Sequence, residues 1–147
     1  MAVNYKPNGY QNVIPYMVVK DLEQLVEFFK KGFDAELNEY VPDGTGNVNH
    51  AEVTIGDSKI MIGRARENHP PLPMMLYIYV KDCKATYKKC LEASGESLME
   101  PQKEFYGDMT AGVKEPQGNS LWIATHVEEI SEEEMKKRLA AHKPKKL

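Results

Sequence analysis

Two stretches of the chain carry the same succession of apolar and polar positions. Residues 13–19 form an apolar, β-branched run that leads into Val-Lys-Asp, and residues 22–33 then space their apolar side chains at helical intervals. Residues 75–80 form a second apolar run that leads into Val-Lys-Asp, and a helical pattern closed by Gly95 follows. The second triplet lies 61 residues after the first. The pattern therefore predicts one strand–helix unit that occurs twice.

Short strand-like segments, separated by glycine-containing turns, follow each helical pattern. Among these turns, Gly56-Asp57 has the composition of a two-residue hairpin turn. Each half of the chain therefore reads as strand, helix and three strands, or βαβββ. The predicted strand segments are about 35–42, 49–56 and 58–65 in the first half, and about 96–105, 109–115 and 120–127 in the second.

A duplicated βαβββ unit predicts an α+β fold in which two modules form a curved, mostly antiparallel sheet around a cleft. We expect a single domain over residues 1–147, with modules at about 12–66 and 74–128. The proline-rich segment 67–73 reads as the linker between them. A capping-box pattern predicts a C-terminal helix at about 131–142.

Composition and charge narrow the function classes. The 147 residues are 41% hydrophobic, which is enough for a core, and the net charge of −3 gives no electrostatic case for nucleic-acid binding. We expect no membrane partner, because no apolar run approaches the ~20 residues of a membrane helix. Cys83 and Cys90 lie seven residues apart in one predicted helix, ~10 Å along its axis, which is too far for a disulfide. Reduced cysteines and the lack of a signal-peptide pattern favour a cytoplasmic location.

Several motifs together give the chain a family resemblance over about residues 12–128. The motifs are Ile-Pro-Tyr-Met-Val-Val-Lys-Asp at 14–21, Phe-Phe-Lys-Lys-Gly-Phe at 28–33, His-Ala-Glu at 50–52, Phe-Tyr-Gly-Asp at 105–108, Glu-Pro-Gln-Gly-Asn at 115–119 and Trp-Ile-Ala-Thr-His-Val-Glu at 122–128. With these motifs, the chain resembles the vicinal oxygen chelate superfamily, also called the glyoxalase/bleomycin resistance/dioxygenase superfamily, and most of all its PhnB-like branch. Related proteins commonly dimerise, so the resemblance implies a homodimer.

The resemblance implies where a metal would be held, and this chain departs from that pattern. The family's ligand positions fall on Ile14, Met75 and Trp122, and a fourth falls within Ile60–Ile62. Divalent cations in proteins are bound by imidazole or carboxylate, and none of these side chains supplies either. We therefore predict that the family metal site is absent and that no cofactor is used.

Strand alternation predicts which other side chains share the cleft face with those positions. Tyr16, Tyr77, Tyr79 and His126 have the same parity as Ile14, Met75 and Trp122. His50 and Glu52 face the cleft if the apolar residues between and after them pack under a helix. Tyr106 is expected at the cleft rim. The candidate ligand-binding residues are Tyr16, His50, Glu52, Tyr77, Tyr79, Tyr106, Trp122 and His126.

Polar residues near this set leave alternatives open. His50, Glu52 and His126 are the candidates for a relocated divalent-metal site, and a His–Glu pair is a candidate general base. Asp108 is expected to bond the backbone of its own turn, where contact with a ligand is the alternative. Arg64 and Arg66 are either ordinary exposed arginines or contacts for an anion.

An aromatic cleft with few polar groups is typical of a small-molecule pocket. The leading hypothesis is a protein that binds a small aromatic or apolar molecule without metal. One alternative is a lyase, isomerase or dioxygenase with a relocated metal site. Another is an interaction protein that uses the aromatic face for dimerisation.

Overall fold

The computed structural model describes residues 2–142, and the two βαβββ modules that the repeat predicts are both present. The predicted order of elements is confirmed, and the boundaries differ by a few residues. The first module consists of β1 (Tyr16–Val19), α1 (Leu22–Phe33), β2 (Glu36–Pro42), β3 (Val48–Ile55) and β4 (Ser58–Arg64). The second consists of β5 (Met75–Tyr79), α2 (Cys83–Glu92), β6 (Glu96–Lys103), β7 (Asp108–Lys114) and β8 (Ser120–His126), and α3 (Glu132–Ala141) follows.

Each module forms its own four-stranded sheet, and the two sheets have the same topology. Their strand orders are β1-β4-β3-β2 and β5-β8-β7-β6. The first strand pairs in parallel with the last, while the other pairs are antiparallel, which confirms the mostly antiparallel α+β fold. Tyr16 is opposite Met61 in the first sheet, and Tyr77 is opposite Trp122 in the second. Met61 is therefore the structural counterpart of Trp122.

The two helices pack on the convex side of the sheets and against each other. Asp21 and Asp82 cap their N-termini by accepting hydrogen bonds from the backbone amides of Gln24 and Ala85. Gly32 permits a close approach of α1 and α2, because a Cβ atom there would lie 2.8 Å from the sulfur of Cys90. The core beneath the helices includes Met17, Leu22, Leu25, Phe28, Phe29, Ile62, Leu121 and Ile123.

Both cysteines are free and buried, which confirms that Cys83 and Cys90 do not bridge. Burial raises the pKa of the Cys90 thiol to about 12, because the thiolate would lose its hydration among apolar neighbours. Neither thiol is therefore a candidate nucleophile.

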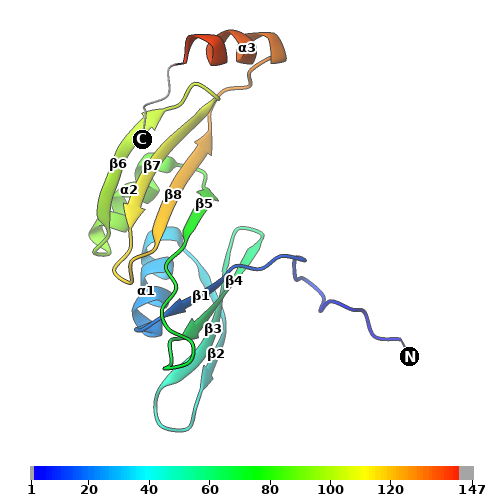
Figure 1. Ribbon diagram of the computed structural model, residues 1–147, viewed down its shortest axis with the longest axis vertical. Helices are drawn as coiled ribbons and strands as arrows, with labels where there is room; N and C mark the ends of the chain where they lie inside the picture. The colour runs from blue at the N-terminus through cyan, green and yellow to red at the C-terminus, as the bar shows by residue number, and fades with distance from the viewer. Residues whose placement is uncertain (1, 143–147) are drawn as a thin grey trace.

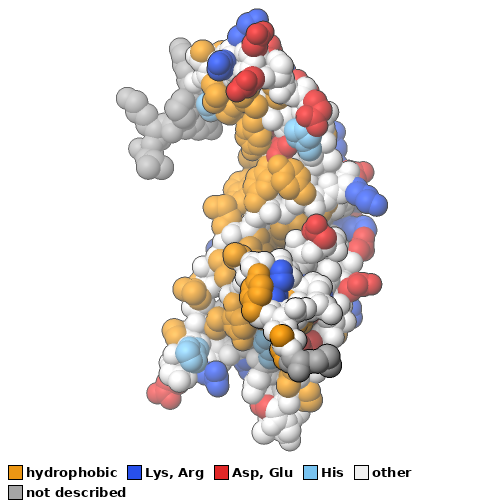
Figure 2. Space-filling model, turned by 90° about the vertical axis from the view of Figure 1, so that its right-hand side faces the viewer, with side chains coloured by type: hydrophobic (Ala, Val, Ile, Leu, Met, Phe, Trp, Pro, Cys, Tyr) orange, Lys and Arg blue, Asp and Glu red, His pale blue; other side chains and the backbone are white. Residues whose placement is uncertain are grey.

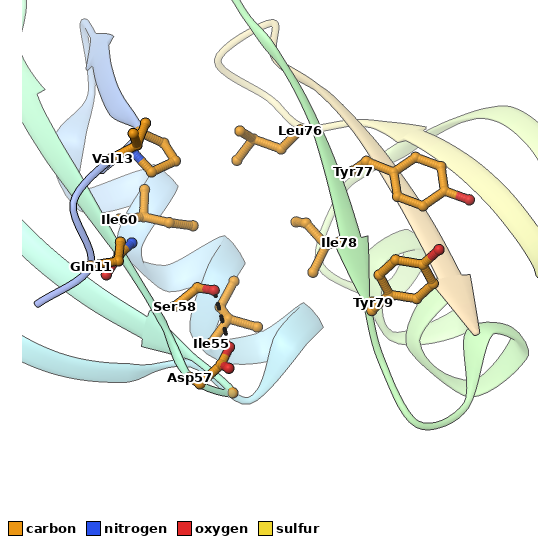
Figure 3. A pocket seen from close by; sticks show the side chains of 12 residues that line it. Gln11, Val13, Ile55, Asp57, Ser58, Ile60, Leu76, Tyr77, Ile78 and Tyr79 are labelled. Atoms are coloured by element: carbon orange, nitrogen blue, oxygen red, sulfur yellow. Dashed lines mark hydrogen bonds between the residues drawn. The ribbon is translucent and has the colours of Figure 1, made fainter. Parts of the chain in front are cut away.

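The modules lie end to end, so that the molecule is elongated (Figure 1). The N-terminal arm projects from the side of the first module. Between the modules, an apolar hollow of about 420 Å³ separates β5 from the β3–β4 hairpin. Figure 3 shows Leu76 and Ile78 directed towards Ile55 and Ile60, while Tyr77 and Tyr79 point to the opposite side of β5.

Helix α3 lies beyond the far end of the second module and buries no side chain of its own. Arg138 holds it there through an ion pair with Glu128 and a 3.1 Å hydrogen bond to the carbonyl of Phe105. Hydrogen bonds from Arg138 and Lys103 lower the pKa of Glu128 to about 2. Within residues 2–142, no helix combines the length and apolar character needed to cross a bilayer.

Candidate functional site

The concave side of the second sheet presents a cluster of aromatic and sulfur-containing side chains, which we call the aromatic face. It consists of Met75, Tyr77, Met99, Tyr106 and Trp122 and surrounds a shallow hollow of about 420 Å³. Glu104 and Thr110 provide polar groups at this hollow and hydrogen-bond each other at 3.0 Å. Large hydrophobic side chains gather along this side of the molecule (Figure 2). A flat apolar molecule has stacking partners here and few polar groups to satisfy.

Asp108 lies beside the aromatic face and contacts three polar side chains there. Its side chain is only 3% exposed and accepts hydrogen bonds from the hydroxyls of Tyr77 and Tyr79, both at 2.7 Å. Its other carboxylate oxygen lies 2.9 Å from Nδ1 of His126. The expectation that Asp108 bonds the backbone of its own turn is therefore wrong. Because positive-φ Gly107 (φ 100°) turns the chain just before β7, the carboxylate points inward to these three side chains.

The contacts around Asp108 fix the protonation states of the cluster. Burial alone would raise the pKa of Asp108, but hydrogen bonds from His126, Tyr79 and Tyr77 hold it below its ordinary value. The bond to Asp108 in turn raises the pKa of His126. Burial, followed by the bond to Asp108, raises the pKa of Tyr77. At neutral pH the carboxylate is thus ionised and the tyrosines are protonated donors, so the cluster holds the rings of Tyr77 and Tyr79 in place.

The first module has a separate pocket on its concave face, with a volume of about 480 Å³. Tyr16 and His50 line it, with the Tyr16 hydroxyl 3.4 Å from Nδ1 of His50 and the ring centroids 5.9 Å apart. Arg66 and His69, at either end of a short turn in the linker, complete one wall. This pocket is more polar than the aromatic face.

Glu52 lies on the concave side of β3, as strand alternation predicts, but it is covered. Its side chain is 2% exposed, since Tyr10 of the N-terminal arm donates a 2.8 Å hydrogen bond to it. Lys59 lies 3.9 Å from the second carboxylate oxygen and over the Tyr10 ring. Gln11 secures the arm by bonding both backbone polar groups of Lys59. A ligand therefore meets Tyr10 rather than Glu52.

The eight residues predicted to line one cleft fall into two groups in the structure. Tyr77, Tyr106 and Trp122 belong to the aromatic face, and Tyr79 and His126 adjoin it through Asp108. The remaining residues, Tyr16, His50 and Glu52, lie in the first module. Sheet faces could be predicted by alternation. The separation of the two groups follows from the end-to-end arrangement of the modules.

The residues present do not fit a metal ion. The four family ligand positions carry the apolar side chains Ile14, Met61, Met75 and Trp122, where Met61 now represents the fourth position. The proposed relocated set is also not assembled within the chain. No cluster of three or more His, Cys, Asp or Glu side chains suited to a metal occurs within residues 2–142.

Sequence reasoning missed the partners of Asp108 and the role of Tyr10 at the site. The Phe-Tyr-Gly-Asp turn had already singled out Asp108, but its partners Tyr77 and Tyr79 are 31 and 29 residues away in sequence. Tyr10 gave no signal, because the segment around it reads as a loose polar arm.

Comparison with known proteins places the chain in a family. The model of the glyoxalase/bleomycin resistance protein/dioxygenase superfamily matches residues 12–123. An uncharacterized protein of Mycobacterium tuberculosis, Rv0887c, is 23% identical over 96% of this chain and 87% of its own length.

Solved structures share the fold at low sequence identity. TioX from Micromonospora sp. ML1 has a TM-score of 0.70 and 16% identity, covering 80% of this chain and 99% of that one. A PhnB protein from Bacillus cereus has a TM-score of 0.60 and 18% identity, covering 78% and 99%. With a family model that spans most of its length and a duplicated βαβββ fold to match, this chain belongs to the glyoxalase/bleomycin resistance protein/dioxygenase superfamily.

Proposed function

We propose that this chain is a PhnB-like member of the superfamily that binds a small, flat, largely apolar molecule without metal. The observation that carries the proposal is the aromatic face, where Met75 and Trp122 occupy positions at which metal-using relatives have ligands. Tyr77 and Tyr106 add two more rings around the same hollow. Stacking and burial of apolar area supply the affinity in such a site.

Binding without turnover agrees with the state of the polar groups beside the hollow. Both oxygens of Asp108 are occupied by internal hydrogen bonds, and His126 is placed between Asp108 and Glu129. A general base needs a free, correctly protonated atom within reach of the ligand. This cluster positions aromatic rings instead.

The proposal includes a cytoplasmic homodimer. The aromatic face leaves large apolar side chains open, with Met75 65% and Tyr77 47% exposed, and monomers seldom expose extended apolar surface. In the arrangement that we propose, the aromatic face of one copy is opposite the first-module pocket of the other. Each ligand would then be enclosed by both copies. The free, buried cysteines suit a reducing compartment.

Metal analysis and ligand binding together test the proposal. The metal content of untagged protein purified without chelator is measured by elemental mass spectrometry, before and after incubation with zinc, iron, manganese and nickel. We expect metal near zero in both samples, and saturable quenching of Trp122, the single tryptophan, by 1-naphthylmethanol. Trp122→Phe should weaken binding about tenfold when followed by calorimetry. Leu91→Ala, an exposed apolar change on α2, is the control.

Other outcomes identify the alternative functions. Stoichiometric metal together with metal-dependent turnover would replace the proposal with an enzyme. Dissociation of the dimer by Tyr77→Ala or Trp122→Phe, without any probe binding to the wild type, would assign the aromatic face to dimerisation.

A further inference from the structure

The concave pocket of the first module gathers side chains that carry or can carry positive charge. Arg64, Arg66, His50 and His69 line it, with Asn49 and Tyr16 as further polar contacts. No acidic residue occurs among the described residues that line this pocket. The chain as a whole is acidic, with a net charge of −3, so this local surplus is not a reflection of composition.

Arg64 is committed to the fold. Its guanidinium donates to both carboxylate oxygens of Glu23, one at 2.6 Å, to the carbonyl of Val48 at 2.8 Å and to that of Lys20 at 3.1 Å. Arg64 therefore closes the pocket wall and is neutralised by Glu23. It is not available to a ligand.

The backbone of Arg66 is fixed by hydrogen bonds, whereas its guanidinium is unpaired within residues 2–142. Its amide and carbonyl bond those of His69 at 2.8 and 3.0 Å, which closes a tight turn over Glu67 and Asn68. Residues paired in this way project their side chains to the same side of the ladder. Within residues 2–142, the Arg66 guanidinium has no hydrogen-bond partner, so its donors remain available. His50, which also lines the pocket, contacts Tyr16 through Nδ1, and its Nε2 has no hydrogen-bond partner within residues 2–142.

We propose that this pocket binds an oxyanion, such as a carboxylate or a phosphate group, carried by the ligand of the aromatic face. A guanidinium beside imidazole and amide donors matches the geometry of an oxyanion. The inference rests on the proposed function for the rest of the ligand, because the aromatic face of a second copy would hold the apolar part. The ligand class is accordingly an aromatic acid or aromatic phosphate ester.

The test compares probes that share a naphthyl ring and carry charged or uncharged groups on it. 1-Naphthoate, 1-naphthyl phosphate and uncharged 1-naphthylmethanol are titrated into the dimer, and inorganic phosphate is titrated separately. The indole N–H signal of Trp122 reports on the aromatic face. The ring signals of His50 and the Nε–H signal of Arg66 report on the pocket.

We expect at least one anionic probe to move both sets of signals and to bind about tenfold more tightly than 1-naphthylmethanol. Comparison of the two anions shows whether carboxylate or phosphate is preferred. Arg66→Gln should abolish the preference, because it weakens binding of the anionic probes far more than binding of 1-naphthylmethanol. Lys88→Gln, which removes one charge from the exposed side of α2, should retain it.

Each contrary result has a separate meaning. Equal affinities for the charged and uncharged probes, or a preference that persists in Arg66→Gln, would overturn the oxyanion site and leave the aromatic ligand standing. If no naphthyl probe binds, the proposed function fails. The titration with inorganic phosphate then shows whether the pocket binds an oxyanion. If phosphate shifts the His50 and Arg66 signals saturably, and Arg66→Gln removes the shift at His50, the oxyanion site is supported. If phosphate leaves these signals in place, the oxyanion site is overturned.

Discussion

The indole ring of Trp122 lies over Gly112 on the neighbouring strand, so closely that a Cβ atom at position 112 would be 2.5 Å from the ring. The first module has a similar contact between a different pair of strands, β1 and β4. A Cβ atom at Gly63 would lie 2.7 Å from the hydroxyl of Tyr16. On both concave faces, a glycine in the sheet thus allows an aromatic ring to lie flat against the strands. The low floor of the aromatic face depends on this glycine.

Replacing Gly112 by alanine should lift the indole from the sheet. We expect a loss of about 1–3 kcal/mol in the free energy of unfolding, because a methyl group is forced into occupied space. The fluorescence of Trp122 should change, and binding of 1-naphthylmethanol should weaken. Urea denaturation and fluorescence titration measure these effects.

A double mutant isolates the contact between the two residues. In a Trp122→Ala background, the cost of Gly112→Ala should nearly disappear, because the clashing ring is gone. The same cost in both backgrounds would show that the glycine matters for the strand backbone instead.

Asp108→Asn should destabilise the second module. The substitution removes the charge that binds Tyr77, Tyr79 and His126, and it replaces one acceptor oxygen by a donor. We expect a loss of about 2–3 kcal/mol in the free energy of unfolding, which is the scale of hydrogen bonds to a buried charge. Chemical denaturation provides the measurement. Asp57→Asn in the exposed β3–β4 turn is the matched control and should stay within about 0.5 kcal/mol of wild type.

The pair formed by Asp108 and His126 should give stability a characteristic dependence on pH. Since the pKa of His126 is raised above 6.5, its contribution is complete below that pH and is lost as pH rises through the folded-state pKa. Since the pKa of Asp108 is lowered, its contribution is present above pH 3.8 and is lost as pH falls through the folded-state pKa.

His126→Gln should therefore remove the decline in stability on the alkaline side of pH 6.5 while the acid limb remains. Denaturation midpoints measured from below pH 3.8 up to pH 9 cover both limbs and test this expectation. His69→Gln, in the linker, should keep the wild-type profile. An unchanged alkaline limb in His126→Gln would assign the decline to other groups.

The sequence predicts strands, helices and sheet faces because these depend on local periodicity. Strand alternation predicts that Tyr77 and Trp122 lie on one face, and the two residues are direct neighbours on β5 and β8. Helix boundaries follow from caps such as Asp21, whose side chain bonds an amide only three residues away. Such features are encoded within a few neighbouring residues.

Contacts between segments that are distant in sequence could not be predicted in this way. Glu52 has the parity of a cleft residue, yet Tyr10, 42 residues earlier, covers it. Asp108 has the composition of a turn residue, yet its partners come from β5 and β8. Neither contact leaves a periodic trace in the sequence, because each depends on how the segments are arranged in three dimensions.

The hydrogen bond from Tyr10 to Glu52 attaches the N-terminal arm to the first module. Loss of this hydrogen bond should release the arm. Tyr10→Phe takes away the 2.8 Å donor to a buried carboxylate whose other partner, Lys59, is 3.9 Å away. An underpaired buried charge costs about 1–3 kcal/mol, and water can reach Glu52 only if the arm lifts. We therefore expect faster amide hydrogen exchange at Lys59, whose N–H is bonded by Gln11, and a similar loss of stability. Tyr5→Phe in the same arm is the control, because the Tyr5 hydroxyl accepts its bond from Asn12 in solvent and should contribute less than about 0.5 kcal/mol. Equal effects of the two substitutions would show that Gln11 rather than the bond to Glu52 holds the arm.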